Sequence, residues 1–143
     1  MFRSPRPAPA DLSETASFKL YLDYYTQRVG LTENKLALGA RIHQQRLNKI
    51  SNGIVKTVDV ETLVRLCLVL GLTEQEAVDL MARRERALSP ANLLHGTYRE
   101  LLSIYAKKKI DYQAGAAALA NILNEADEYL KSRGFEPFYD KSI

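Results

Sequence analysis

The sequence predicts an all-α fold, and three observations support this prediction. Apolar residues recur at three- and four-residue spacing through most of the chain, which is the period of amphipathic helices. No segment alternates apolar and polar residues as a half-buried strand would. Residues that favour helix starts precede the apolar segments, and glycines follow them. The 143 residues, 46% of them hydrophobic, suffice for one ordinary domain or two very small ones.

The composition argues against several classes of protein. No apolar run approaches the ~18 residues of a transmembrane helix, and the N-terminal MFRSPRPAPA lacks the apolar stretch of a secretory signal. Cys67 is the only cysteine, which excludes a disulfide framework and favours a reducing, cytoplasmic location. His43 and His95 lie far apart without cysteine partners. We therefore expect no metal site, and we find no catalytic residue set and no cofactor motif.

The first half of the chain predicts an arm followed by three helices. Residues 1–10 are proline-rich and polar, and we expect a disordered arm. A helical pattern starts from Asp11 and ends at Gly30. Thr32 can cap a short helix that Gly39 interrupts. A second short helix, predicted over 42–52, ends at an Asn-Gly pair that suits a left-handed stop. The apolar faces of these helices carry Phe18, Tyr21, Leu22, Tyr25, Val29, Leu36, Ala37, Ile42, Leu47 and Ile50.

Two further helices complete a predicted N-terminal domain over 11–88. Asp59 can cap the first, and Gly71 ends it. Thr73 and Glu76 stand at the spacing of a capping box at the start of the second. The residues expected to face the core are Val60, Leu63, Val64, Cys67 and Leu70 in the first, and Ala77, Val78 and Met81 in the second.

Pro90 marks the clearest internal boundary, because proline fits only a first helical turn or a loop. Two longer helices are predicted in the C-terminal region over 89–134, one across roughly 91–108 and one across roughly 112–132 with Asp111 as a possible cap. Gly134 and Pro137 then end regular structure, leaving a tail over 135–143. The apolar faces of the two helices carry Leu94, Tyr98, Leu101, Leu102, Tyr105, Ala116, Leu119, Leu123, Ala126 and Leu130.

The charge of the chain is unevenly distributed. The net charge is only +3, yet residues 34–58 hold five lysines or arginines and no Asp or Glu. A surface of one sign favours a polyanion as partner. The alternative is a solvated helix face with no partner.

Residues 31–53, LTENKLALGARIHQQRLNKISNG, resemble the lambda-repressor-like helix-turn-helix family, also called the Cro/repressor type or XRE family. The L-T-x-x-x-L-A segment before the turn and the apolar-x-x-apolar-x-N-G segment after it align without a gap. Downstream, VETLVRLCLVLGLT resembles the fourth helix of that family. The resemblance covers about residues 17–85 and implies a five-helix bundle that binds DNA.

The resemblance also implies roles for individual residues. The second helix of the motif enters the major groove and presents its N-terminal residues to base edges. Base readout is thereby assigned to Gln44, Gln45, Arg46 and Asn48. Phosphate contact is assigned to Thr32, Lys35, Arg41, His43, Lys49, Asn52 and Lys56. Arg41 occupies a turn position that the family usually gives to glycine. Because a left-handed arginine costs about 1 kcal/mol or more, we expect a reshaped turn.

We expect a sequence-specific regulator of transcription, a repressor, that binds double-stranded DNA as a homodimer on two half-sites. The C-terminal helices carry more apolar surface than two helices bury alone, so they either dimerise or dock on the N-terminal bundle. The residues assigned to dimerisation are Leu102, Tyr105, Leu119, Leu123 and Leu130. The alternative function is an adaptor or antitoxin that binds a partner protein through residues 91–143. Glu33 and the apolar Ile54-Val55 favour this alternative.

Overall fold

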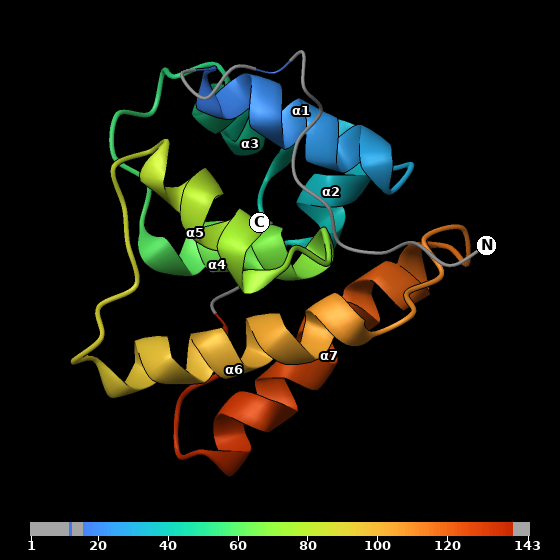
Figure 1. Cartoon of the computed structure of the whole chain (residues 1–143). Coiled ribbons are helices and arrows are strands. Elements are labelled where there is room, and N and C mark those ends of the chain that lie inside the picture. The colour runs from blue at the N-terminus through green and yellow to red at the C-terminus, as the bar shows by residue number, and fades with distance from the viewer. Residues whose placement is uncertain (1–11, 13–15, 139–143) are drawn as a thin grey trace.

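The computed structural model describes Leu12 and residues 16–138, and this part of the chain is helical with no β-strand (Figure 1). The all-α prediction is therefore confirmed. The arm predicted over 1–10 and the last five residues of the tail lie outside the described residues. In chain order the helices are α1 (Phe18–Arg28), α2 (Glu33–Gly39), α3 (Gln44–Ser51), α4 (Val60–Val69), α5 (Glu74–Ala82), α6 (Leu93–Lys107) and α7 (Ala116–Ser132).

Side-chain caps fix where most of the N-terminal helices begin. The hydroxyl of Thr32 accepts from the Lys35 amide, and a carboxylate oxygen of Asp59 accepts from the Thr62 amide. Thr73 and Glu76 form the predicted capping box. Each cap satisfies an amide that the first helical turn leaves without a partner. The first helix starts later than the pattern from Asp11 suggested, because Ser17 caps it at Phe18.

The predicted start of the last helix is wrong by about four residues. The Asp111 carboxylate accepts from the Gln113 amide and makes a local turn instead of a helix cap. Gly115 follows with φ +109°, and α7 begins at Ala116 without a side-chain cap. The hydroxyl of Tyr112 donates to the Val69 carbonyl at 2.8 Å, which ties this connection to the end of α4. The turn at Asp111 and the contact between Tyr112 and Val69 therefore keep residues 112–115 out of the helix that the local pattern predicted.

The inward face of α5 also differs from the prediction in one residue. Val78 is exposed, and Leu80 is fully buried beside Ala77 and Met81. Ala77, Leu80 and Met81 stand at positions i, i+3 and i+4 and share one face, so Val78 falls on the outer side of the helix.

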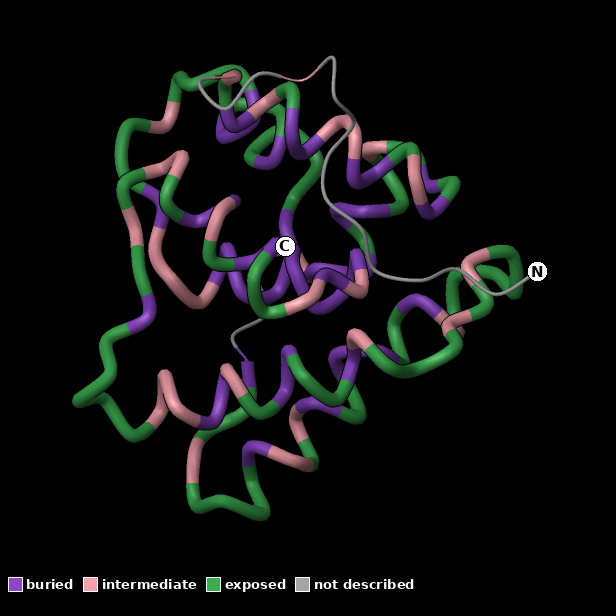
Figure 2. The backbone as a smooth tube through the Cα atoms, viewed as in Figure 1, coloured by how far each residue is buried: buried purple, intermediate pink, exposed green. Residues whose placement is uncertain are grey.

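The core is centred on α4, which contacts α2, α5, α6 and α7. All of its residues from Thr62 to Val69 are buried, and Figure 2 colours the backbone by this burial. A helix buried on every side lies at the centre of a domain. One contiguous core therefore joins the N-terminal bundle to α6 and α7.

The C-terminal helices dock on the bundle of their own chain. α7 packs against α2 and α4, and α6 packs against α4 and α5 (Figure 1). The five residues assigned to dimerisation are all buried in this single chain, so none of them is at a surface that a second chain could contact. These residues are Leu102, Tyr105, Leu119, Leu123 and Leu130. Of the two alternatives for this region, the structure shows docking, and the seam assigned to a dimer is corrected.

The start of the predicted tail is anchored too. Phe138 is buried, and its ring stacks on Tyr98 of α6 with 5.7 Å between ring centroids. Gly134, with φ +83°, turns the chain back from the end of α7 toward this position. The segment after α7 is consequently part of the packed structure as far as Phe138.

Candidate nucleic-acid interface

The helix-turn-helix unit consists of α2, a turn over 40–43, and α3. α3 runs from Gln44 to Ser51, so it is shorter at both ends than the predicted 42–52. Ile42 is buried in the turn and not in the helix. The helix starts at Gln44 because the His43 ring caps it, with Nδ1 accepting from the Gln45 amide at 3.2 Å. Gly53, with φ +75°, supplies the predicted left-handed stop.

The two faces of α3 differ sharply in chemistry. The inward face holds Leu47, Ile50 and Ser51, all buried. The outward side is polar or basic, contains no acidic residue, and consists of Gln44, Gln45, Arg46, Asn48, Lys49 and Asn52. All six are exposed. The structure therefore gathers the four residues assigned to base readout on one accessible helix.

Asn48 is oriented by neighbours on both sides. Its amide nitrogen donates to Glu33 of α2 at 3.3 Å, and its amide oxygen accepts from Asn52 at 3.2 Å. Asn52 donates as well to the Asn48 carbonyl at 2.9 Å. Glu33 thereby binds a residue of α3, and any base contact by Asn48 would compete with this internal bond.

His43 has one ring nitrogen available for a partner. Because Nδ1 accepts the amide of Gln45, the neutral ring carries its proton on Nε2. His43 is exposed, so Nε2 can donate to an anion. This geometry fits the phosphate contact assigned to His43.

The other residues assigned to phosphate contact surround α3. Lys35, Lys49, Asn52 and Lys56 are exposed, and the exposed Thr32 uses its hydroxyl to cap α2. Sequence reasoning missed Arg84, whose guanidinium donates to the carbonyls of Ile50 and Val55. This arginine, which follows the end of α5, holds the end of α3 and the loop after it.

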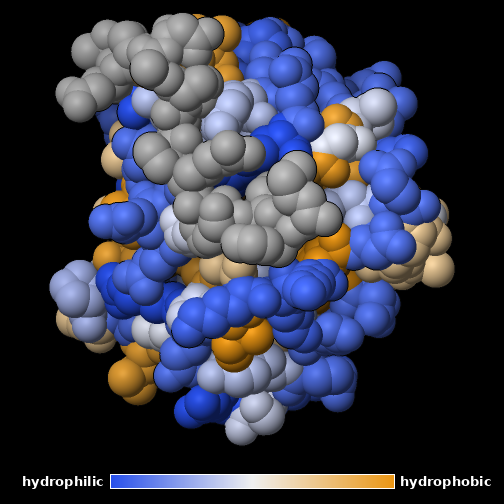
Figure 3. Space-filling model, turned by 45° about the vertical axis from the view of Figure 1, so that its right-hand side comes forward, coloured by the Kyte–Doolittle hydropathy of each residue, from blue (hydrophilic) through white to orange (hydrophobic). Residues whose placement is uncertain are grey.

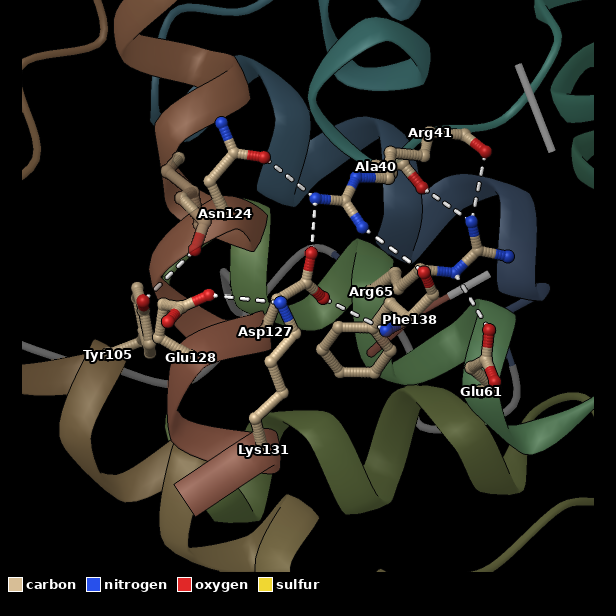
Figure 4. Close-up of polar contacts among 11 residues, drawn as sticks. Ala40, Arg41, Glu61, Arg65, Tyr105, Asn124, Asp127, Glu128, Lys131 and Phe138 are labelled. Atoms are coloured by element: carbon tan, nitrogen blue, oxygen red, sulfur yellow. Dashed lines mark hydrogen bonds and ion pairs between the residues drawn. The ribbon is translucent and has the colours of Figure 1, made fainter. Parts of the chain in front are cut away.

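Arg41 is the exception among the assigned residues. Its φ of +56° is the left-handed conformation that we expected a reshaped turn to avoid, and its guanidinium turns away from α3 toward α7 (Figure 4). Nη2 donates to Asp127 at 2.7 Å and to Asn124 at 2.8 Å, and Nη1 donates to the Phe138 carbonyl at 3.2 Å. The phosphate contact assigned to Arg41 is therefore corrected, because its donors already have partners within the chain.

A second arginine, on α4, binds the backbone of the same turn from the core side. Arg65 of α4 is fully buried, and its Nη1 donates to the carbonyls of Ala40 and Arg41, both at 2.9 Å. Its Nη2 donates to Thr62, and its Nε lies 3.8 Å from a carboxylate oxygen of Glu61. Nothing in the sequence indicated this role, since a single arginine on an apolar helix resembles a position at the edge of the core.

A short helix held across another by a tight turn, with a polar and basic outward face, defines a helix-turn-helix DNA-binding domain. Comparison with protein families agrees: the family model described as Helix-turn-helix matches residues 25–76. Residues 25–76 are a helix-turn-helix domain of the Cro/repressor type, also called the XRE family. This is a family of DNA-binding regulatory domains. The match ends within α5, and neither curated proteins nor solved structures give a significant match to the chain.

The rest of the described surface offers few other kinds of site. Within residues 12 and 16–138, no cluster of three or more His, Cys, Asp or Glu residues is arranged to hold a metal ion. None of the helices in this part of the chain has the length and apolarity needed to cross a membrane. On the face drawn in Figure 3, hydrophobic residues form separate patches among hydrophilic ones.

Proposed function

We propose that the protein is a sequence-specific regulator of transcription that reads the major groove of double-stranded DNA with α3. The observation that carries this proposal is the exposed, acid-free outward face of α3 on a domain of a DNA-binding family. Glutamine amides pair bidentately with adenine N6 and N7, and arginine pairs with guanine O6 and N7. Gln44, Gln45 and Arg46 therefore supply base readout, with Asn48 as a fourth candidate.

The backbone of the duplex would be held by the surrounding cations. Lys35, Lys49 and Lys56 are exposed and can neutralise phosphates, and His43 and Asn52 can donate hydrogen bonds. Such contacts fix the position of the protein and carry no sequence information. We infer repression as the sense of regulation, because occupancy of a site is sufficient for it.

We also propose that the protein binds as a dimer. One module contacts too few base pairs for selectivity, and this type of domain uses two half-sites about one helical turn apart. Because the five residues assigned to dimerisation are buried, the contact between protomers has to involve other residues. The molar mass of the DNA complex, measured by light scattering, tests this proposal, and a complex with one chain per site would contradict it.

Selection of bound sites from random duplexes, followed by a salt titration on the best site, tests the proposed function. We expect an enriched site with two-fold symmetry and affinity that falls steeply between ~50 and ~200 mM salt, with a log-log slope of about −0.9 per phosphate contact. The proposal fails if the purified protein prefers no duplex sequence.

An adaptor that binds a partner protein is the second candidate, and one observation favours it. Ile54, 63% exposed, lies in the loop after α3, where a DNA-binding surface is usually basic. An adaptor would show no measurable duplex binding even at low salt, so the same titration separates the two functions.

A further inference from the structure

The turn of the helix-turn-helix is bound on its outer side by the C-terminal region. Arg41 reaches from the turn to α7, where Asn124 and Asp127 accept from one guanidinium nitrogen at 2.8 and 2.7 Å. The Arg41 and Asp127 side chains are only 16% and 14% exposed, so this ion pair is largely shielded from solvent. Figure 4 shows Asn124 and Asp127 extending from α7 toward Arg41. These two acceptors lie outside the segment that matches the helix-turn-helix family.

Asp127 joins three parts of the chain at one point. One of its carboxylate oxygens accepts from Arg41, and the other accepts from the Phe138 amide at 2.9 Å. Arg41 in turn donates to the Phe138 carbonyl, which closes a ring of hydrogen bonds. Because Phe138 is stacked on Tyr98 of α6, the ring connects the turn to both C-terminal helices. Charge-assisted bonds of this length are the strong ones in proteins.

The inner side of the same turn is held by Arg65, which donates to the carbonyls of Ala40 and Arg41. The turn is thus fixed between α4 on one side and α7 on the other. Its conformation sets how α3 leaves α2, and therefore how the outward face of α3 meets the groove. A backbone in the left-handed region at Arg41 is held by its surroundings and not by its own preference.

We propose that Asn124 and Asp127 are positioning residues for DNA recognition, acting through Arg41 to fix the orientation of α3. This inference rests on the proposed function, since it assumes that α3 reads DNA. It assigns the C-terminal helices a part in specificity without any contact with the duplex.

The test compares Asp127→Ala with Glu125→Gln. Glu125 lies on the same helix, is exposed, and bonds Lys108 and Asn121 instead of the turn. Both changes remove one negative charge, so long-range attraction to DNA alters equally. We expect Asp127→Ala to lose about tenfold in affinity for the best site, within the 5–150-fold range usual for coupled sites. Affinity for scrambled duplexes and the salt slope should match those of Glu125→Gln.

Further variants separate positioning from simple loss of structure. Asp127→Asn keeps an acceptor of the same shape and should recover part of the affinity, and Asn124→Ala should show a smaller loss. The double variant Arg41→Ala/Asp127→Ala should bind no more weakly than Arg41→Ala, because Asp127 bonds to the turn only through Arg41. Arg41→Ala should leave the salt slope unchanged. A slope reduced by about 0.9 would indicate a phosphate contact instead and would overturn the inference.

Amide hydrogen exchange without DNA keeps the inference testable if the proposed function fails. We expect faster exchange in the turn over 40–43 and in the first turn of α3 for Asp127→Ala than for Glu125→Gln. Equal exchange rates would overturn the positioning role. The positioning role would also be overturned if Asp127→Ala bound the best site as tightly as Glu125→Gln, or more tightly. Tighter binding would mean that α7 keeps Arg41 away from DNA in the wild-type protein. If the wild-type protein preferred no duplex sequence, the proposed function and the DNA-recognition part of the inference would both be overturned. Faster exchange in Asp127→Ala would then still show that α7 holds the turn.

Discussion

Arg65 places a positive charge in the middle of an otherwise apolar helix. A buried charge is costly unless hydrogen bonds satisfy it. Its donors reach two carbonyls of the turn and the hydroxyl of Thr62, which itself donates to Asp59 at 2.7 Å. The charge therefore stabilises the turn only while all these groups remain together.

The first prediction concerns this buried arginine. Arg65→Ala should lower the free energy of unfolding by about 3 kcal/mol or more, because it leaves two buried carbonyls without a donor and opens a cavity. Chemical denaturation monitored by circular dichroism measures the change. Arg46→Ala, the same substitution at an exposed position of α3, should stay within about 0.5 kcal/mol of wild type. Equal effects of the two changes would contradict the supporting role of Arg65.

The second prediction concerns pH and His95. Its Nδ1 accepts from the Ser89 amide at 2.9 Å, and partial burial, with a smaller effect of Arg99, lowers its pKa below the ordinary 6.5. The unfolded chain therefore binds this proton more readily than the folded one. The resulting stability is fully present above the unfolded value of 6.5 and is lost as pH falls through the lowered folded pKa.

Wild type should consequently lose more unfolding free energy than His95→Gln between about pH 7 and pH 5, the range in which histidine titrates. Carboxylates that titrate in this range are common to both proteins and cancel in the comparison. Denaturation midpoints at several pH values measure the difference, and parallel pH profiles would argue against a lowered pKa for His95.

At the scale of elements, α3 packs on the domain with one face and would contact DNA with the other. Leu47 and Ile50 hold the helix on the domain, and the residues that would meet a base lie on the opposite side. Substitutions on the outer face should therefore change recognition without changing stability.

The third prediction follows from this separation. Gln44→Ala and Gln45→Ala should each weaken binding to the best site by about 1–3 kcal/mol and relax preference at particular base pairs. Affinity for unrelated duplexes should barely change. Titrations against a panel of single-base variants of the site provide the measurement. Lys49→Ala is the matched comparison, because a lost phosphate contact should weaken all duplexes alike. Unchanged site preference in both glutamine variants would refute the recognition role of α3.

The fourth prediction concerns the core face of α7. Leu123 is fully buried against its own chain, so Leu123→Ala should cost about 2–5 kcal/mol of unfolding free energy through lost contacts and a residual cavity. Molar mass by light scattering should not change, because the Leu123 side chain is covered within its own chain. Leu93→Ala, at a position 83% exposed, should be nearly neutral. A fall in molar mass for Leu123→Ala would instead support the dimer seam that the sequence suggested.

At the scale of the whole molecule, α6 and α7 form a layer that covers α4 and the end of α2. Gly39 shows how closely these parts approach: a Cβ there would lie 3.1 Å from Val69 and 3.7 Å from Leu119. The helix-turn-helix segment and the C-terminal region therefore share one core and should unfold together.

The fifth prediction tests that unity. Truncation after Ser89 should abolish cooperative thermal unfolding, because it exposes the face of α4 that α6 and α7 cover. The expectation from sequence alone, a C-terminal appendage that dimerises, implies a folded monomer after the same truncation. Circular dichroism melting, together with binding of a dye specific for exposed apolar surface, distinguishes the two outcomes. A sharp melting transition in the truncated chain would show that the N-terminal bundle folds alone.

The sequence by itself determined the class of fold, the order of the helices and the helix-turn-helix unit. These features depend on local chemistry: caps such as Thr32 and Asp59, glycine stops, and the period of apolar residues are all encoded within a few neighbouring positions. The outward residues of α3 could be named from sequence for the same reason.

Only the tertiary structure decided what covers the apolar faces of α6 and α7 and where the long polar side chains end. An apolar stripe on a helix shows that this surface must be removed from water. A helix of the same chain and a helix of a second chain can cover it equally well. The Arg41 guanidinium meets Asp127, 86 residues away in the chain, and the Phe138 carbonyl, 97 residues away. No local pattern encodes such pairs, because they form only when packing brings distant segments together.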